Sequence, residues 1–239
     1  MSSSILPLRA RDLRFLVDTG PLIDGVSLTI EPGSSTVVLG PNGAGKSLLL
    51  RLLHGMLEPT SGTITWQKSS SGDLRRRQSM VFQRPVLLRR SVEANIAYAL
   101  CALSIPRPHR SEMINLALER AGLTHARRVR ARLLSVGEQQ RLSVARALAS
   151  EPDILFLDEP TASLDPVSVQ RIETLVLEAN NRGTAIVLVT HDIGQARRLG
   201  RDVIFLHDGK DVERGPAETF MLNPTTEVAR AYLEGGIVV

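Results

Sequence analysis

The segment GPNGAGKS, residues 40–47, combines glycines, a lysine and a serine at a spacing that can bind phosphate. It fits the pattern G-x-x-x-x-G-K-S, follows a short apolar run and opens a helical pattern, which is the context that this motif requires. Gly43 and Gly45 let backbone amides approach phosphate oxygens. Lys46 can reach the β- and γ-oxygens of a nucleotide, and Ser47 can hold Mg²⁺. A glycine-rich turn with a stray lysine is the alternative, and the strand, the spacing and the helix together argue against it.

Two adjacent carboxylates, Asp158 and Glu159, follow a second apolar run in ILFLDEP, residues 154–160. Asp158, at the end of the expected strand, can take a water of a Mg²⁺ ion. Glu159 points onward to where a γ-phosphate and its attacking water would lie. Two acids near a surface turn are ordinarily only solvated. After a hydrophobic strand, in a chain with a phosphate loop, we favour the functional interpretation.

A third segment, RLLSVGEQQRLSVARAL at residues 132–148, has a turn at its front and an amphipathic helix behind it. The start of a helix presents free backbone N–H groups and the positive end of the helix dipole, so it can bind an anion. The chain therefore carries two candidate phosphate-binding helix starts, of which the one at 40–47 is by far the better phosphate loop.

The composition is that of an ordinary globular chain. Hydrophobic residues make up 43% of the 239 residues, and the longest apolar run, AIVLV at 185–189, is far too short to cross a bilayer. The N-terminal sequence shows no secretion signal, so we expect a cytoplasmic protein. The formal net charge is +4, but the arginines are spread over several helical patterns, which favours solvated faces over a nucleic-acid or membrane surface. We expect the single cysteine, Cys101, to be a small buried hydrophobe.

Short apolar, β-branched runs indicate strands that are buried on both faces. They lack polar–apolar alternation and are separated by helical patterns, which predicts a mostly parallel sheet and an α/β fold. Two earlier segments, 26–30 and 62–66, do alternate and predict an antiparallel sheet with one wet face. KSSSGD at 68–73 predicts a polar loop. The four buried strands are expected at 36–40, 153–158, 184–190 and 202–207.

Helical patterns dominate the middle of the chain, where no convincing strand occurs. The segments 91–103 and 111–122 both predict helices. Another helix is expected after Asp165, which can cap it, with Pro166 in its first turn. We therefore expect a helical lobe inserted into an α/β core.

Six motifs resemble those of the ATP-binding subunits of ABC transporters, and the resemblance covers essentially the whole chain. The three segments described first look like the Walker A loop, the Walker B strand and the signature motif of that family. Six motifs in the family's order make coincidence negligible. In chain order they are Walker A (40–47), the Q-loop glutamine Gln83 in VFQRP, the signature LSVGEQQ (134–140), Walker B (154–160), the D-loop SLDP (163–166) and the switch histidine His191 in VTHD.

The resemblance implies a fold and a domain organisation. It predicts a single ABC ATPase domain over 1–239, of the P-loop NTPase type, with a mostly parallel sheet, an N-terminal antiparallel β subdomain and an inserted α-helical lobe. The catalytic core is expected over 1–83 and 152–239. The lobe, which carries the signature motif, is expected over about 84–151.

The resemblance also assigns the site residues and their ligands, which are ATP and Mg²⁺. The catalytic residues would be Glu159, which polarises the attacking water, His191, which contacts the γ-phosphate, and Gln83, which links the lobe to a permease. Mg²⁺ is expected on Ser47, Gln83 and Asp158. The residues implied to bind the nucleotide are Gly40, Pro41, Asn42, Gly43, Ala44, Gly45, Lys46, Ser47, Leu48, Ser135, Gly137 and Asp165.

The dimer of this family explains the second helix start. Two ATPase subunits of an ABC transporter pack head to tail, so each ATP lies between the phosphate loop of one chain and the signature helix of the other. Ser135, the amide of Gly137 and the helix dipole would then face the γ-phosphate of the partner's nucleotide. ATP thereby acts as dimer glue, and hydrolysis weakens the dimer.

The function that the resemblance implies is ATP hydrolysis that powers import through a separate membrane permease. The segments 80–100 and 190–210 are most similar to importers of oxyanions, tungstate and molybdate above all, with phosphate importers next. Expected partners are a second ATPase subunit in a homodimer, the integral membrane permease and, indirectly, an extracytoplasmic solute-binding protein. They would hold the chain at the inner face of the membrane, and no nucleic acid is expected. The alternatives are an importer ATPase for an amino acid and a nucleic-acid-associated ATPase of the same superfamily.

Three features depart from the family pattern. Val136 stands where the signature usually has Gly, and a β-branched residue suits that turn poorly if the backbone needs a positive φ. In the same motif Glu138 stands where Gln is usual. Leu48 replaces a threonine whose hydroxyl would contact phosphate. The aromatic residue that stacks on adenine would lie near 15–17, where Phe15 is the candidate.

Overall fold

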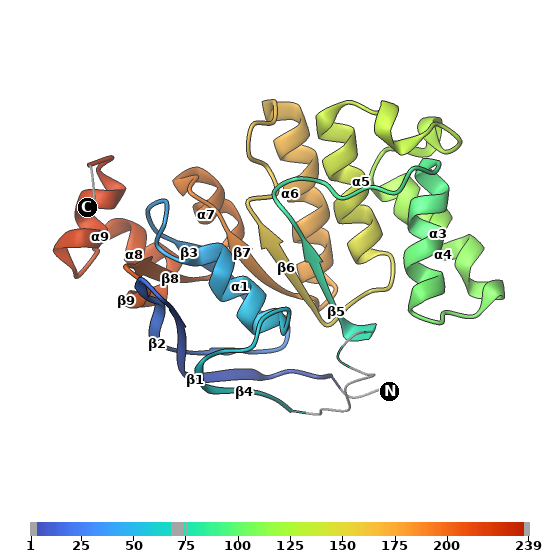
Figure 1. Cartoon of the computed structure of the whole chain (residues 1–239). Helices are drawn as coiled ribbons and strands as arrows, with labels where there is room; N and C mark the ends of the chain where they lie inside the picture. The colour runs from blue at the N-terminus through green and yellow to red at the C-terminus, as the bar shows by residue number, and fades with distance from the viewer. Residues whose placement is uncertain (1–3, 68–73, 75, 237–239) are drawn as a thin grey trace. The chain divides into compact units, whose positions relative to one another are not determined.

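The computed structural model describes residues 4–67, 74 and 76–236, which divide into two compact units (Figure 1). The first unit comprises Met1–Ser69 and Ala185–Val239, and the second is the segment Ser70–Thr184 between them. Among the described residues, no helix has the length and apolar character needed to cross a bilayer. The polar loop predicted at 68–73 lies outside the described residues, and the division into core and lobe near residues 84 and 151 stays a prediction.

An antiparallel sheet belongs to the first unit, with the strand order β2-β1-β4. Its strands are β1 (Leu8–Val17), β2 (Gly20–Ile30) and β4 (Ser61–Trp66). The alternating segments predicted the last two, which is confirmed, but β1 was not predicted. Its pairing register is broken after Ala10, and Asp12 has a positive φ of 46°. Such a bulge interrupts the alternation by which a half-buried strand is found in a sequence.

A second sheet of the first unit carries three of the predicted buried strands. β3 (Ser35–Leu39) lies between β7 (Ala185–Val189) and β8 (Asp202–His207) and is parallel to both. All residues of β3 and β7 are buried, which is why their sequences are nearly continuous apolar runs. β9 (Lys210–Pro216) is antiparallel to β8. It was not predicted, because five of its seven residues are charged or proline.

Helices follow the strands of the first unit. α1 (Lys46–His54) comes directly after the loop that leaves β3, and α7 (Ile193–Leu199) lies between β7 and β8 in the chain. α8 (Ala217–Leu222) and α9 (Glu227–Leu233) come last. α1 is anchored by buried leucines, each of which contributes about 1.5–3 kcal/mol. They are Leu49, Leu50, Leu52 and Leu53.

The second unit contains the fourth predicted strand and the helices of the expected lobe. β6 (Ile154–Asp158) is buried throughout and runs parallel to β5 (Gln78–Val81), which was too short and polar to be predicted. The predictions of helices at 91–103, at 111–122 and after Asp165 are confirmed. The helices are α3 (Val92–Ala102), α4 (Arg107–Arg120), α5 (Val136–Leu148) and α6 (Pro166–Asn181), with 3₁₀ turns at Thr124–Ala126 and Ala131–Leu133.

A buried asparagine fixes the segment that follows Gln83. Asn95, in α3, is fully buried. Its Oδ1 accepts the N–H of Leu88 at 2.9 Å, and its Nδ2 donates to the carbonyl oxygen of Ser91 at 2.9 Å. Leaving such a buried group without a partner costs about 1–3 kcal/mol. The amide therefore holds this stretch of chain against α3.

The prediction that Cys101 is buried is wrong, because its side chain is exposed. α3 buries Ile96 and Leu100. Cys101 is one residue further along, which turns its side chain about 100° around the helix axis and away from that face. The apolar residues around Cys101 in the sequence gave no indication of which face it would take.

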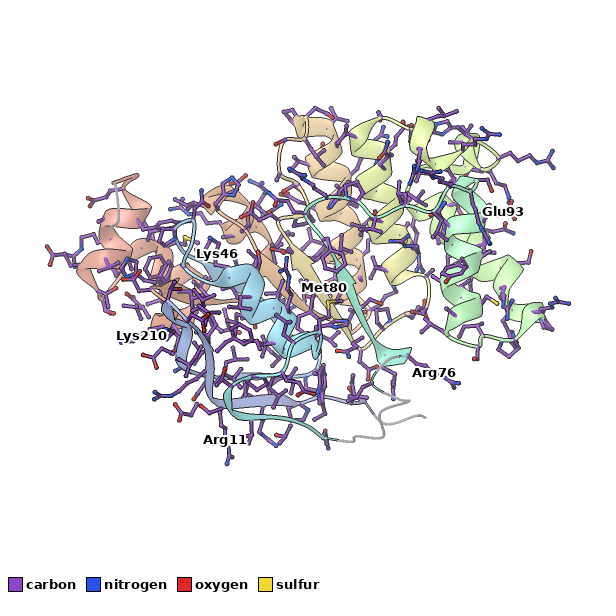
Figure 2. The ribbon with its side chains drawn as sticks, viewed as in Figure 1. Arg11, Lys46, Arg76, Met80, Glu93 and Lys210 are labelled. Atoms are coloured by element: carbon purple, nitrogen blue, oxygen red, sulfur yellow. The ribbon has the colours of Figure 1, made fainter. Side chains whose placement is uncertain are left out.

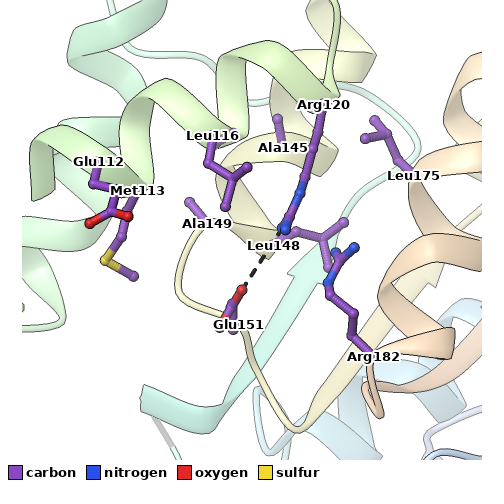
Figure 3. Close-up of a pocket in the computed structure, with 11 residues that line it drawn as sticks. Glu112, Met113, Leu116, Arg120, Ala145, Leu148, Ala149, Glu151, Leu175 and Arg182 are labelled. Carbon is purple, nitrogen blue, oxygen red and sulfur yellow. Dashed lines mark ion pairs between the residues drawn. The ribbon is translucent and has the colours of Figure 1, made fainter. Parts of the chain in front are cut away.

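A cavity of about 150 Å³ lies among α4, α5 and α6 (Figure 3). Its lining is mostly apolar, and Arg120 and Glu151 form an ion pair of 3.8 Å beside it. None of the residues predicted for the nucleotide site lines this cavity. The candidate site lies instead in the loops that follow the strands.

Candidate active site

The phosphate loop needs glycine at two positions for close packing. A Cβ atom at Gly40 (φ 146°) would lie against the carbonyl oxygen of Leu206, closer than two atoms can approach. A Cβ at Gly45 (φ 95°) would lie 2.7 Å from the carbonyl oxygen of Leu22. Gly43 (φ 85°) differs, because open space surrounds the position of its Cβ. Gly40 and Gly45 therefore shape the loop, while Gly43 leaves the backbone open to a phosphate group.

Lys46 is held over this loop as the first residue of α1 (Figure 2). Its side chain is buried, and its Nζ donates to the carbonyl oxygens of Gly40 at 2.8 Å and Pro41 at 2.7 Å. The N-cap residue Gly45 provides no side-chain cap for α1. An ammonium group and a helix N-terminus at one loop both favour an anion there.

The other residues of the loop differ in exposure. Asn42 is exposed and Ala44 is buried. Ser47 and Leu48 lie in the first turn of α1 and are both half-buried. Phe15, the candidate for stacking on adenine, is half-buried in β1.

His191 lies at the same edge of the parallel sheet as the phosphate loop. Val38 of β3 pairs with Val189 of β7. Gly40 lies two residues after Val38, and His191 lies two residues after Val189, so both follow the ends of neighbouring parallel strands. Ligands of α/β proteins bind at the carboxyl ends of such strands. His191 is exposed, and Asp192 next to it is the N-cap of α7. The structure thus brings two of the predicted site elements to one sheet edge.

Gln83 and Glu159 meet in the second unit. Gln83 follows β5 and Glu159 follows β6, its parallel neighbour, and Gln83 Nε2 donates to Glu159 Oε2 at 3.2 Å. Asp158 ends β6 and is buried, whereas Glu159 is half-buried. Glu159 has a positive φ of 44°, a conformation that costs a residue with a side chain about 1–3 kcal/mol and that is concentrated at active sites. The sequence predicted both residues but not their contact.

The signature turn is an ordinary helix start. Ser135 is the N-cap of α5, and its Oγ accepts the N–H of Glu138 at 3.3 Å. Val136, the first residue of the helix, is 62% exposed. Among the described residues it is not one of those with a positive φ. The backbone strain considered for Val136 therefore does not arise.

Gly137 brings the start of α5 against the start of α6. A Cβ atom on Gly137 would lie 2.8 Å from the Cβ of Ser168 and closer still to its Oγ. Ser168 in turn donates its N–H to Asp165 Oδ1 at 3.0 Å and its hydroxyl to Asp165 Oδ2 at 2.6 Å. These bonds lower the pKa of Asp165, which therefore stays ionised as the N-cap of α6. Signature motif and D-loop are packed together, as two helix starts.

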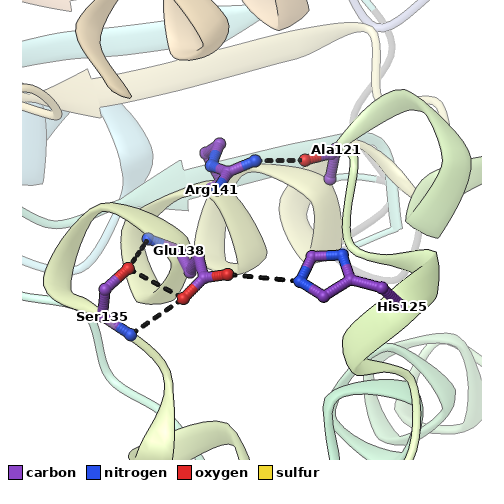
Figure 4. A network of polar contacts seen from close by, with 5 residues as sticks. All are labelled: Ala121, His125, Ser135, Glu138 and Arg141. Carbon is purple, nitrogen blue, oxygen red and sulfur yellow. Dashed lines mark hydrogen bonds and ion pairs between the residues drawn. The ribbon is translucent and has the colours of Figure 1, made fainter. Parts of the chain in front are cut away.

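Glu138, which stands where the family usually has Gln, closes this turn through its carboxylate. Its Oε2 accepts the N–H of Ser135 at 3.0 Å and the hydroxyl of Ser135 at 2.8 Å (Figure 4). The pattern Ser-x-x-Glu at 135–138 is the sequence signal of such a capping box. His125 Nε2 lies 3.4 Å from Glu138 Oε1, a contact that no local pattern could indicate.

The side chains predicted for Mg²⁺ suit that ion chemically. Ser47, Gln83 and Asp158 supply the hydroxyl, amide and carboxylate oxygens that Mg²⁺ takes together with phosphate oxygens and water. The described part of the chain holds no group of three or more His, Cys, Asp or Glu side chains that could bind a metal ion. The assignment of Mg²⁺ to these three residues stays a prediction.

Comparison with known proteins agrees with these motifs. Residues 23–162 match the family model described as ABC transporter. The chain belongs to this family. Its fold is the ABC ATPase fold, with an antiparallel N-terminal sheet, and like other members it binds and hydrolyses ATP.

The relatives are importer subunits with different cargoes. The phosphate import ATP-binding protein PstB 2 of Natronomonas pharaonis is 38% identical to this chain, over 92% of this chain and 84% of its own length. TupC, the ATP-binding protein of the tungstate uptake system of Peptoclostridium acidaminophilum, is 38% identical over 79% of this chain and 89% of its own length. Methionine import ATP-binding proteins are also among the relatives.

A solved structure of the family supports the assignment of the fold. The ATP-binding cassette MJ0796, a dimer in a post-hydrolysis state bound to ADP and Pi, is similar to this chain with a TM-score of 0.78 and 27% identity. The match covers 88% of this chain and 98% of that one. The six motifs thus belong to an ATPase whose relatives are subunits of import systems.

Proposed function

We propose that this ATPase powers the import of an oxyanion of the tungstate or molybdate type through a separate membrane permease. The observation that carries the proposal is the likeness to a tungstate and a phosphate import subunit, because both cargoes are tetrahedral oxyanions. Phosphate is the second candidate, since the likeness to the phosphate subunit extends over more of the chain. The ATPase never touches the cargo, so no residue of this chain selects it.

In this proposal the phosphate loop binds the triphosphate of ATP. The amides of Gly43 and Gly45 and the ammonium of Lys46 contact its oxygens, within a loop that extends from Gly40 to Leu48. Mg²⁺, when bound by Ser47, Gln83 and Asp158, neutralises the charge that develops on the phosphates. The open backbone at Gly43 and the buried ammonium support this role.

Glu159 is proposed to accept a hydrogen bond from the attacking water and polarise it. The hydrogen bond from Gln83 supports this role because it orients the Glu159 carboxylate, and the positive φ of Glu159 is a strained conformation of the kind found at active sites. His191 is proposed to contact the γ-phosphate, which its place at the sheet edge beside the phosphate loop supports.

The proposed assembly is a head-to-tail homodimer. Ser135 and the amide of Gly137 at the start of α5 face the γ-phosphate on the partner subunit, with Asp165 beside them at the start of α6. The packing of Gly137 against Ser168 supports a fixed relation between these two helix starts. The dimer would sit at the inner face of the membrane, below the permease, and an extracytoplasmic binding protein would deliver the solute.

The proposed contact with the permease is the segment after Gln83. Arg84, Arg89 and Arg90 are exposed, and Arg90 lies 5.7 Å from the ring centre of Tyr98, which is itself half exposed. These guanidinium groups can pair with carboxylates on a cytoplasmic loop of the permease.

The test is ATPase activity in liposomes that contain the permease isolated with this chain from detergent extracts. We expect weak activity in isolation and stimulation when the external binding protein carries tungstate or molybdate. A preparation with Glu159→Gln is the control for hydrolysis by this site. If phosphate alone stimulates, the second candidate is correct. Stimulation only by an amino acid or a sugar would overturn the oxyanion proposal while leaving the ATPase in place.

A further inference from the structure

The signature helix already has an anion at its N-terminus, the carboxylate of Glu138. Oε2 of Glu138 accepts both the backbone N–H of Ser135 at 3.0 Å and its hydroxyl at 2.8 Å (Figure 4). The other oxygen, Oε1, lies 3.4 Å from His125 Nε2. One carboxylate therefore takes both proton donors of the residue that the proposed function assigns to the partner's γ-phosphate.

A hydroxyl group has a single proton, so it can donate one hydrogen bond at a time. While Ser135 donates to Glu138, it cannot donate to a phosphate oxygen. The same hydrogen bonds, with smaller contributions from Arg141 and His125, lower the pKa of Glu138, so the carboxylate stays ionised at neutral pH. A negative charge also suits the N-terminus of α5, because the helix dipole is positive there.

We propose that Glu138 is a positioning residue that holds the Ser135 hydroxyl and competes with the γ-phosphate of the partner's nucleotide for it, which weakens the ATP-dependent dimer. This inference rests on the proposed function. When the γ-phosphate docks, the Ser135 hydroxyl has to turn away from Glu138 to donate to it. The docked phosphate and the Glu138 carboxylate then lie as two anions at the same helix start. Glutamine at the same position keeps one oxygen that can accept both hydrogen bonds from Ser135, but it removes the charge, weakens those hydrogen bonds and replaces the oxygen that faces His125 with an NH₂ group.

The test variant is therefore Glu138→Gln, made both in the active chain and together with Glu159→Gln, which preserves bound ATP. The matched control is Glu119→Gln, which removes one negative charge from an exposed position on α4. Each protein is titrated in concentration on a sizing column with light scattering, in the presence of Mg²⁺ and ATP. KM and kcat for ATP are measured on the active chains, and ATP binding and the melting temperature are measured for all of them.

With Glu138→Gln we expect the ATP-dependent dimer to bind more tightly. Its dissociation constant should fall about fivefold for each ATP that the dimer holds between its subunits, because removing one charge–charge repulsion of about 1 kcal/mol in water corresponds to that factor. KM for ATP should fall with it, and kcat should change by less than about twofold. The melting temperature should fall only slightly, because the capping hydrogen bonds remain while the favourable charge at the helix start is lost. Glu119→Gln should change none of these quantities.

Two results would overturn the inference. If Glu138 only caps the helix, Glu138→Gln either leaves the dissociation constant of the dimer unchanged, or it destabilises the helix start and raises that dissociation constant. If every chain binds ATP and none dimerises, the head-to-tail assembly of the proposed function is wrong, and the role of Glu138 falls with it. The two failures are distinguished by whether the protein with native Glu138 forms the dimer.

Discussion

The contact between Gly137 and Ser168 allows a sharp test of how the two helix starts are packed. Gly137 is the second residue of α5, and a methyl group there would lie 2.8 Å from the Cβ of Ser168, where carbon atoms normally keep about 3.5–4.0 Å. We therefore expect Gly137→Ala to force α5 and α6 apart locally, although alanine is the better helix former.

The magnitude follows from three contributions. The Ser168 hydroxyl can rotate away from the new methyl group, but it then loses its 2.6 Å hydrogen bond to the ionised and solvent-exposed Asp165. The overlap of the two Cβ atoms remains, and overpacking of this kind costs about 1–3 kcal/mol when rotation is not enough. The gain of alanine over glycine in a helix is at most about 1 kcal/mol. Overpacking less the gain from alanine gives a net loss of about 1–2 kcal/mol, to which the lost hydrogen bond of Ser168 adds a small amount.

The assay is urea unfolding followed by circular dichroism, with the melting temperature as a second measure. A chain of this size should melt about 2–8 °C lower for a loss of that magnitude. Gly194→Ala is the matched control, because Gly194 is the second residue of α7 and its nearest neighbours are the side-chain ends of Arg198 and Asp192. That variant should be neutral or slightly stabilised. If Gly137→Ala is as stable as the native chain, the close packing of α5 on α6 is refuted.

Three further outcomes follow from the site. Glu159→Gln should nearly abolish ATP hydrolysis and leave ATP binding intact, since the amide keeps the shape but does not polarise water; substantial turnover would remove Glu159 from catalysis. Val136→Gly should change the ATPase rate by less than about tenfold. A tenfold change requires about 1.4 kcal/mol in the activation free energy, and the Val136 backbone is an ordinary helix start with no strain to release. A larger rise in rate would show that the backbone at Val136 is strained. The hydrogen bonds from Arg127, at 2.9 and 3.0 Å, lower the pKa of Glu93. This pair should stabilise the chain above pH 4.5, and its contribution is lost as the pH falls through the lowered pKa. Glu93→Gln should therefore lower the melting temperature slightly at pH 7 but not at pH 3, and an equal loss at both pH values would show that the charge is not responsible.

Local sequence patterns were sufficient for the buried strands and for the motifs. β3, β6 and β7 are buried on both faces, so their sequences are mostly apolar and could be recognised without knowledge of their neighbours. The exceptions lie at the strand ends, where Ser35 and Thr36 begin β3 and Asp158 ends β6. The glycines of the phosphate loop could be predicted for the same reason, since the backbone there requires them whatever the rest of the chain does.

Features that depend on contacts distant in sequence could not be predicted. β1 contains a bulge, and β5 is a strand of four residues that is defined by its pairing with β6. The exposed face of Cys101 depends on what packs against α3. The contacts of Gln83 with Glu159 and of His125 with Glu138 join residues whose separation no local pattern spans. The positive φ of Glu159 likewise has no signal in its residue type.

The position of β3 between β7 and β8 has a consequence for the time during which the chain is synthesised. Both hydrogen-bonding edges of β3 pair with strands that begin at Ala185 or later. At about 5–20 residues per second, roughly 150 residues must be added before the first partner strand exists, an interval of roughly 7–30 seconds. Throughout that interval a short, apolar, β-branched strand leaves the ribosome with neither edge covered, which is the condition under which chains associate with one another. The order of the strands thus makes the nascent chain dependent on protection that the finished sheet no longer needs.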